Sequence, residues 1–414
     1  MRIAIDGMLL GRRSSGVEGS IANLVQDLAA AGNHDYTLFA SSDEFASDRV
    51  VKQGDAEAAH LLEGAAPSAP QPTKTAVTAH RPPSELSPRF RVLGTRWPVQ
   101  FRPLRILWQQ IALPMALARG GFDLLHAPGY VAPLLAPLPV VLTLYDTLAL
   151  SHPGLCTVGN RWHYRFMVPL SARRAAAVIV PSETTRRDVE RFMPWATARI
   201  RVIPLGVDKR FSVLQDEAAT RRLQTTYGLT GPYILFVGGL EPKKNLARLI
   251  GAFHLLKQRR DLPHRLVLAG APSWDRSDVE RAIRETGLGE AVLLPGFVPP
   301  DLLPALYRGA ELFVFPSLYE GFGLPPLEAM ACGTPVIVSD RGALPEIAGP
   351  GALAVNPLMT SDIAEAMESV LTQCDVRTEL IARGLRRAAE FSWDRVAAAT
   401  EAVYAEVAGG RRPA

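Results

Sequence analysis

The 414-residue sequence predicts an α/β protein with two doubly wound, Rossmann-like domains that face each other across a cleft. Three observations support this fold class. The chain is too long for one ordinary hydrophobic core, so two domains are expected. Short apolar runs alternate with helical segments along the chain. The alternation restarts near Pro232, where PYILFVGGLEPKKNLARLIGAFHLL is typical of a strand, a glycine turn and a helix.

The same pattern divides the chain into domains. We expect an N-terminal domain over residues 1–210 and a C-terminal domain over 211–390, followed by a terminal helix and tail over 391–414. Alanine, proline, serine and glutamine dominate residues 53–83, which predicts an irregular insertion over about 41–100.

Composition excludes several classes of protein. Hydrophobic residues make up 48% and charged residues 21% of the chain, as in soluble globular proteins. The net charge of +4 is compatible with an anionic substrate or membrane surface, but it is too weak to indicate nucleic-acid binding. The three cysteines lack metal-ligand spacing and favour a reducing cytoplasmic compartment; they are Cys156, Cys332 and Cys374.

Neither the N-terminus nor the longest uncharged run predicts a membrane segment. The first residues, MRIAID, are typical of a charged first strand rather than a signal peptide. Residues 124–145 contain no Asp, Glu, Lys or Arg, but they contain four prolines, which a spanning helix would not tolerate. We interpret this run as strand, loop and strand within a buried parallel sheet.

The first domain begins with a strand over 2–6, a glycine-rich loop and a helix over about 20–31. The loop lacks the G-x-G-x-x-G fingerprint, which argues against a dehydrogenase. Further on, arginines alternate with aromatic residues between 96 and 119. This segment is either an amphipathic helix over 106–118 packed on the sheet, which we favour, or a surface for anionic lipid or a lipid diphosphate.

Polar residues follow the next two predicted strands. Ligands of open α/β sheets bind beyond the carboxyl ends of strands, so His126, Tyr145 and Asp146 are candidates for the cleft. His126 equally fits an ordinary hydrogen-bonded histidine. Ser182 then follows a strand and is a plausible N-cap for a helix.

The most informative stretch is 314–346. A short buried strand ends in a loop with Glu320, and the following helix contains Glu328. The backbone N–H groups of Gly321, Phe322, Gly323 and Leu324 could approach an anion near the helix start. The two carboxylates would accept hydrogen bonds from sugar hydroxyls on either side of a phosphate. The alternative is that Glu320 is simply solvated and that Glu328 is a first-turn acid stabilised by the helix dipole.

A basic pair, Lys243 and Lys244, lies in the strand-to-helix turn of the restarted pattern. Two adjacent lysines are usually a solvated face. At the carboxyl edge of a sheet, opposite a second anion-binding loop, they would instead hold a diphosphate.

Residues 314–346 resemble the nucleotide-sugar signature of the retaining family-4 glycosyltransferases, which have the GT-B fold and belong to the glycosyl transferases group 1. The LEPKKN segment resembles the mannosyltransferase-like subgroup. The resemblance implies that Glu320 faces the donor sugar, that Glu328 holds the ribose hydroxyls, and that residues 321–324 contact the diphosphate or sugar. It also implies a terminal helix that crosses back to the first domain.

Further roles carry over by position. Gly16 would approach the donor phosphates, Gly239 stands where relatives commonly have arginine, and the turn ending at Val298 would read the nucleotide base. Tyr145 and Asp146 occupy the place of a His-Asp pair in many relatives, with Tyr145 and His126 on the acceptor side.

Together these observations predict a retaining hexosyltransferase of cell-surface polysaccharide assembly. GDP-mannose is the preferred donor, with UDP-glucose and dTDP-rhamnose left open, and the acceptor is a glycan or a polyprenyl-diphosphate-linked glycan. Lys243, Lys244, Glu320 and Asp146 are the candidate catalytic residues. No D-x-D pair occurs, so we expect neither a metal nor a cofactor, and the lysines would stabilise the leaving diphosphate.

Two other classes remain open: another GT-B enzyme, such as an epimerase or phosphorylase, and a non-catalytic sugar-nucleotide-binding protein. Tyr145 in place of the relatives' histidine favours the second of these. We expect a cytoplasmic protein at the inner face of an anionic membrane, without a nucleic-acid partner.

Overall fold

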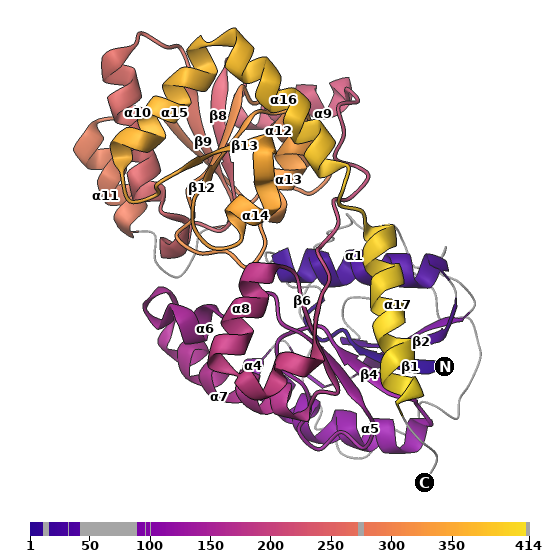
Figure 1. Cartoon of the computed structure of the whole chain (residues 1–414). Helices are drawn as coiled ribbons and strands as arrows, with labels where there is room; N and C mark the ends of the chain where they lie inside the picture. The colour runs from indigo at the N-terminus through magenta and orange to yellow at the C-terminus, as the bar shows by residue number, and fades with distance from the viewer. Residues whose placement is uncertain are drawn as a thin grey trace.

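The computed structural model describes residues 1–10, 16–31, 33–41, 89–95, 97–99, 101–271 and 277–410. Within these residues the chain forms two parallel β-sheets, each with helices on both faces, arranged as two stacked domains (Figure 1). This arrangement confirms the predicted fold class.

The N-terminal domain alternates strands and helices. Its described elements are β1 (Arg2–Asp6), α1 (Gly16–Ala31), β2 (Asp35–Ser41), β3 (Phe90–Thr95), α4 (Arg102–Leu107), a π-helical turn (Trp108–Ala112), α5 (Leu113–Gly120), β4 (Leu124–Ala127), β5 (Val140–Thr143), α6 (Leu148–Ser151), α7 (Val158–Arg174), β6 (Ala177–Val180), α8 (Glu183–Phe192) and β7 (Ile200–Val202). The described strands are ordered β3-β2-β1-β4-β5-β6-β7, and all pairs are parallel.

Two sequence predictions need correction in this domain. Strand β3 lies inside the segment expected to be an irregular insertion, and it pairs in parallel with all of β2 from Tyr36 to Ser41. Phe90 and Thr95 are buried at its two ends, which explains why this part is ordered as a strand. Residues 42–88 of the expected insertion lie outside the described part of the chain. Helix α1 begins at Gly16, four residues before the predicted start.

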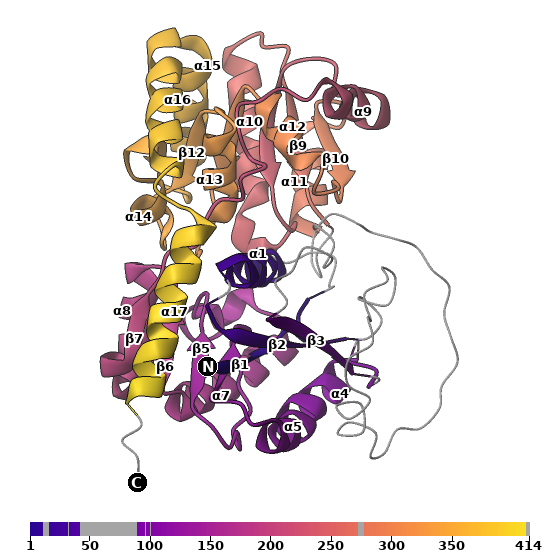
Figure 2. The same ribbon diagram turned by 90° about the vertical axis from the view of Figure 1, so that its right-hand side faces the viewer.

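The arginine-rich segment is helical, as favoured from the sequence. Helices α4 and α5 are joined by the π-helical turn, in which the Leu113 N–H donates to the carbonyl of Trp108. Pro114 follows at once, and because proline has no N–H it cannot make the usual helical bond here. Trp108 is fully buried in the cluster that packs these helices on the sheet. Helices α4 and α5 lie on the face of the sheet opposite α1 (Figure 2).

The C-terminal domain repeats the plan. Its described elements are α9 (Glu217–Tyr227), β8 (Tyr233–Val237), a short 3-10 helix (Pro242–Lys244), α10 (Leu246–Arg259), β9 (Arg265–Ala269), α11 (Ser277–Thr286), β10 (Val292–Gly296), α12 (Leu303–Arg308), β11 (Leu312–Phe315), α13 (Leu324–Ala331), β12 (Val336–Ser339), α14 (Leu344–Ala348), β13 (Ala352–Val355), α15 (Thr360–Thr372) and α16 (Cys374–Ala388). The described strands are ordered β10-β9-β8-β11-β12-β13.

The strand order of each sheet indicates where a ligand is expected to bind. In the C-terminal sheet the direction of winding reverses between β8 and β11, and in the N-terminal sheet it reverses between β1 and β4. Open parallel sheets bind ligands outside the carboxyl ends of their strands at this switch point. The loops that follow β8 and β11 are therefore the first place to look for a site.

Helix α17 (Trp393–Gly409) returns from the C-terminal domain and packs against α1, as the resemblance implied (Figure 1). The Tyr36 hydroxyl donates to Glu401 at 2.7 Å, and the hydroxyl of Tyr404 lies 2.6 Å from Nδ1 of His126. The two segments that join the domains also touch, with a bridge between Val207 and Ser392.

His126 is part of this core and does not face the other domain, so its predicted place in the cleft is wrong. The ring is fully buried, and its Nε2 lies 2.8 Å from the hydroxyl of Thr143. Burial lowers the pKa of His126 to about 3. The unfolded ring takes up a proton near pH 6.5, so the folded state loses stability as the pH falls from 6.5 toward 3.

We predict that Tyr404→Phe lowers the free energy of unfolding by about 1–3 kcal/mol, because it leaves a buried ring nitrogen of His126 without its partner. The measurement is the urea midpoint of each variant. Tyr227→Phe, at a half-buried tyrosine that ends α9, is the matched control: it keeps the ring, and the variant should unfold like the wild type. Equal midpoints for both variants would show that the hydroxyl does not stabilise the domain pair.

Candidate active site

Charged side chains gather where β8 and β11 end side by side. Lys243 and Lys244 follow β8 in the short 3-10 helix, and Glu320 follows β11. The strands pair at Leu312–Ile234 and Phe313–Leu235, so their loops leave the same edge of the sheet. The carbonyl of Lys243 also accepts a hydrogen bond from the Leu318 N–H at 2.8 Å, which ties the two loops together.

The centre of the cluster is a buried ion pair. The Lys244 ammonium lies 2.6 Å from Oε1 of Glu320 and 4.6 Å from the centre of the Phe315 ring. Lys243 lies 3.8 Å from the other carboxylate oxygen. Lys244 is only 9% exposed, so its charge acts in a medium of lower effective dielectric constant than water.

The pKa values follow from this arrangement. Burial raises the pKa of Glu320, but Lys243 and Lys244 outweigh it and hold the pKa below its ordinary value. Burial lowers the pKa of Lys244, and the Glu320 carboxylate only partly offsets that effect. Burial also lowers the pKa of Lys243, but Glu320, Asp146 and Glu241 together raise it above the ordinary lysine value.

Asp146 brings the N-terminal domain into the same cluster. It lies just beyond β5 and accepts hydrogen bonds from the Tyr130 hydroxyl at 3.0 Å and the Leu148 N–H at 2.9 Å. Its charge contributes to the raised pKa of Lys243 in the other domain. Tyr145, its neighbour, points inward: its side chain lines a small internal cavity together with His126. The expected acceptor role of the Tyr145 side chain is therefore not supported by its position.

Glu328 lies on α13 and is paired with a residue that the sequence did not suggest. The Tyr307 hydroxyl donates to its Oε2 at 2.8 Å. Burial raises the pKa of Glu328, and Tyr307 and Arg210 lower it in part. Tyr307 and Arg210 belong to α12 and the interdomain segment, and no local motif links them to Glu328.

The glycine loop holds the two domains together. The carbonyl of Gly321 accepts hydrogen bonds from the hydroxyls of Ser182 at 2.7 Å and Thr185 at 3.1 Å, at the start of α8. A Cβ atom on Gly321 would lie 1.9 Å from the carbonyl oxygen of Tyr145 and 2.7 Å from Cβ of Asp146. Glycine is thus needed here for a backbone contact between domains, a role not anticipated from the sequence.

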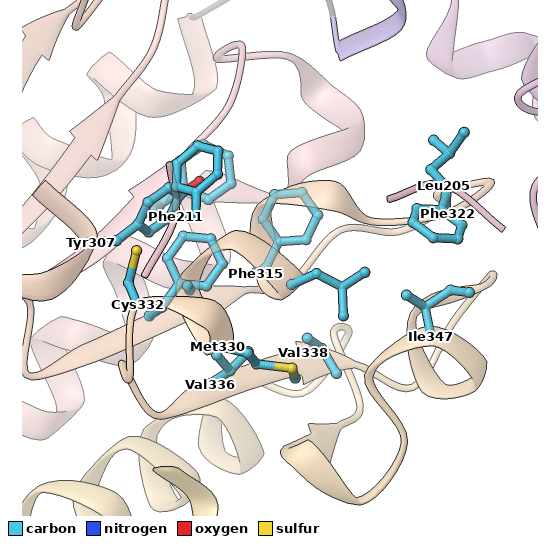
Figure 3. Close-up of a cluster of buried hydrophobic side chains, with 14 of the residues drawn as sticks. Leu205, Phe211, Tyr307, Phe315, Phe322, Met330, Cys332, Val336, Val338 and Ile347 are labelled. Carbon is cyan, nitrogen blue, oxygen red and sulfur yellow. The ribbon is translucent and has the colours of Figure 1, made fainter. Parts of the chain in front are cut away.

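The other residues of the loop divide between core and backbone roles. Phe322 is buried and contacts Phe391, and it lies near Leu205 and Ile347 (Figure 3). Gly323 has φ of 117° and directly precedes Leu324, the first residue of α13. Only the backbone of Phe322 is therefore available to a ligand.

Two further contacts across the domains were missed. Glu346 accepts hydrogen bonds from the N–H groups of Glu183 at 2.7 Å and Thr184 at 2.9 Å, so it caps α8 from the opposite domain. The hydroxyl of Tyr319 donates to Asp188 at 2.6 Å. An acid 163 residues away from the helix that it caps leaves no signal in local sequence.

The remaining predicted donor residues lie in varied settings. Gly16 is the exposed first residue of α1, and the loop before it at 11–15 lies outside the described residues. Gly239 lies in the turn after β8, before the lysines. Val298 is buried, so only its backbone is available to a base, whereas the neighbouring Phe297 is partly exposed.

A polar cavity of about 30 Å³ lies in the N-terminal domain between α4 and α7. Asp6, at the end of β1, accepts a hydrogen bond from Gln109 Nε2 at 2.6 Å, and both line the cavity. Arg105 lines it too, and its Nη1 is buried without a hydrogen-bond partner in the described part of the chain. Among the described residues, no group of three or more His, Cys, Asp or Glu side chains is arranged to hold a metal ion.

Comparison with known proteins identifies the class to which this fold and site belong. The Glycosyltransferase Family 4 model matches residues 14–211, and the Glycosyl transferases group 1 model matches residues 222–387. These two models together cover most of both domains. The chain therefore belongs to this family of GT-B glycosyltransferases, as the resemblance indicated.

The curated relatives include several mannosyltransferases. O-antigen chain mannosyltransferase B of Escherichia coli is 33% identical over 231 residues, which are 56% of this chain and 60% of that protein. The serotype-specific mannosyltransferase WbdA of Escherichia coli is 37% identical, over 53% of this chain but only 27% of the relative. MMP alpha-(1->4)-mannosyltransferase of Mycolicibacterium hassiacum is 29% identical, over 78% of this chain and 80% of that protein.

Solved structures support the fold. Sucrose-phosphate synthase from Thermosynechococcus elongatus matches with a TM-score of 0.73 at 22% identity, covering 99% of this chain and 100% of that one. WaaG, a glycosyltransferase involved in lipopolysaccharide biosynthesis, matches with a TM-score of 0.70 at 16% identity, covering 99% and 100% of the two chains. Anabaena HepE, solved with UDP and glucose, matches with a TM-score of 0.67 at 19% identity, over 98% and 100% of the chains.

We predict that Gly321→Ala separates the two domains, because the added methyl group would overlap the backbone of Tyr145. In the variant the C-terminal domain should pack less closely on the N-terminal domain. Sugar transfer should fall by roughly tenfold or more, because a displacement of about 1 Å between reacting groups can cost up to ~100-fold in rate. Small-angle X-ray scattering would report the larger radius of gyration. Gly289→Ala, where the space around the glycine is open, is the control. An unchanged radius with full activity would contradict this role for Gly321.

Proposed function

We propose that this protein is a retaining hexosyltransferase that moves mannose from GDP-mannose to a glycan acceptor in surface polysaccharide assembly. The observation that carries the proposal is the buried Lys244–Glu320 pair at the sheet's switch point, with Lys243 beside it. The mannosyltransferase relatives favour mannose, and UDP-glucose is the next donor to test.

The lysines fit a reaction that builds negative charge on a leaving diphosphate. Lys244 is desolvated and already positioned, so it needs little reorganisation when the glycosidic bond breaks. Diphosphate oxygens would compete with Glu320 for the Lys244 ammonium. The carboxylate, once released, would accept hydrogen bonds from hydroxyls of the donor sugar.

Glu328 and the loop amides complete the donor side of the proposal. Glu328 would accept hydrogen bonds from the ribose hydroxyls while Tyr307 keeps its carboxylate oriented. The lysines would supply positive charge for the diphosphate, so the proposed mechanism includes no metal ion. In the proposed retaining reaction the leaving group departs, and the acceptor attacks, on the same face of the sugar.

The acceptor side belongs to the N-terminal domain. We infer that the acceptor enters near Asp146 and the polar cavity of Asp6, Arg105 and Gln109. The unpartnered nitrogen of Arg105 suits a phosphate or sugar oxygen of a polyprenyl-diphosphate-linked glycan. A protein that acts on such an acceptor would work at the cytoplasmic face of an anionic membrane.

The first test is transfer itself. With a mannan-type or lipid-linked acceptor, mannose should be transferred from GDP-mannose with the α-configuration retained. Activity should persist in EDTA, because the lysines would neutralise the negative charge on the diphosphate that a metal ion neutralises in other enzymes. The measurements are product analysis by NMR and turnover with and without an excess of EDTA. Transfer restored only by Mg²⁺ or Mn²⁺ would contradict metal independence, and binding without turnover would favour a sugar-nucleotide-binding protein.

The second test concerns Lys244. We predict that Lys244→Ala reduces turnover at saturating donor by roughly a hundred- to a thousandfold, or about 2.7–4 kcal/mol, with a smaller effect on nucleotide affinity. Lys243→Ala/Lys244→Ala should fall further, because Lys243 lies beside the same carboxylate. Lys257→Ala is the control for loss of a lysine outside the site, because the half-buried Lys257 ammonium of α10 donates to the carbonyl of Leu262. A loss confined to affinity would make Lys244 a binding residue only.

A further inference from the structure

The outer face of the N-terminal domain exposes two matching apolar rows. Leu107, Ile111 and Met115 run along α4, the π-helical turn and α5, each four residues apart and each exposed. Trp162, Phe166 and Leu170 run along α7 with the same spacing. Trp162 is 57% and Phe166 58% exposed, and their rings are stacked with centroids 5.8 Å apart.

The two rows belong to one surface. Helices α4, α5 and α7 cover the same face of the sheet, because Trp108 and Val168 lie in one buried cluster while α1 and α17 cover the other face. The loop at 131–138 lies between the rows: Gln110 donates to the carbonyl of Ala132, whose N–H bonds to Ser171 of α7. Leu135 projects from this loop and is 81% exposed. We call these rows and Leu135 the outer apolar face.

The charge around this face has one sign. Residues 101–182 contain seven arginines and two aspartates, with no lysine or glutamate. The aspartates do not lie among the rows: Asp123 accepts a hydrogen bond from the N–H of Arg2, and Asp146 is in the site. Within the described residues, none of these arginines forms a salt bridge. Arg165 and Arg173, both exposed, follow the apolar row of α7.

Large side chains do not gather in this way elsewhere on the described surface. The exposed large apolar residues between 211 and 390 belong to three separate segments; they are Val213, Leu214, Leu294, Phe297, Leu358 and Met359. An apolar face of this extent on a monomer marks an interaction surface. Aromatic side chains flanked by arginine and free of acids are the composition that helices at an anionic bilayer surface display.

We propose that the outer apolar face docks the protein on a bilayer that contains anionic lipids. The apolar rows enter the boundary between headgroups and acyl chains, and Arg165 and Arg173 meet lipid phosphates. A second copy of the chain is a poorer occupant, because a two-fold interface would bring one arginine-rich face against another. Helix insertion across the bilayer is not involved: in the part of the chain that the structure describes, no helix is both long and apolar enough to cross a membrane.

This inference deepens the membrane side of the proposed function and rests on it only for its biological setting. Docking is measured without donor or acceptor. If the protein binds vesicles but transfers no mannose, the docking proposal stands and the donor assignment fails. If it transfers mannose but does not bind vesicles, the donor assignment stands and the docking proposal fails.

The experiment is cosedimentation with large unilamellar vesicles of phosphatidylcholine alone or with phosphatidylglycerol added. The wild type should bind the anionic vesicles and weaken in high salt. Trp162→Ser/Phe166→Ser should weaken binding at least tenfold. Arg165→Gln and Arg173→Gln should each weaken it about fivefold, the factor that corresponds to ~1 kcal/mol per cation at an anionic leaflet.

Matched controls use the same substitutions outside this face. Leu214→Ser, in the interdomain segment, and Arg284→Gln, on α11, should bind like the wild type. Thermal unfolding checks that each variant is folded, and brominated lipids should quench wild-type fluorescence more than that of Trp162→Phe. Equal binding by all variants would overturn the proposal. A wild-type protein that does not bind anionic vesicles would also overturn it. This includes a protein that instead self-associates through the outer apolar face in analytical ultracentrifugation.

Discussion

The desolvated ion pair between Lys244 and Glu320 is the constraint on which the site depends. Both side chains are largely withdrawn from water at the ends of different strands, Lys244 with 11% and Glu320 with 13% of its side chain exposed, so each charge depends on an opposite charge beside it. The pairing of β8 with β11 fixes the distance between them. Asp146 joins from the other domain, so the electrostatic centre of the molecule is shared by two independently wound sheets.

Much of this arrangement was readable from the sequence because it is local. The strand, glycine loop and helix around Glu320, and the turn with Lys243 and Lys244, follow from periodicity and turn chemistry within short segments. That β8 and β11 lie side by side then follows from the family resemblance and the doubly wound plan. Even the Ser182 N-cap was predicted, and its side chain does accept from the Thr185 N–H.

What the sequence did not predict is long-range. The Ser182 hydroxyl meets the Gly321 carbonyl 139 positions away, and His126 meets Tyr404 across 278 positions. Sequence patterns cannot indicate which of many possible long-range contacts will form, because loop closure over long separations depends on the whole fold. His126 is an example. Polar residues at strand ends often face a ligand, but His126 instead contacts the hydroxyl of Tyr404, which belongs to a helix near the other end of the chain.

The crossing of α17 has a consequence for how this molecule can be rebuilt. The chain leaves the first domain near Gly206 and re-enters it at Trp393, and a Cβ atom on Gly206 would lie 2.4 Å from the backbone nitrogen of Trp393. In topological terms the second domain is an insertion into the first, with both junctions side by side. A chimera that exchanges donor domains between relatives should therefore be cut at these two adjacent points. A single cut would pair α1 with a foreign α17 and place another protein's residue where Tyr404 meets His126.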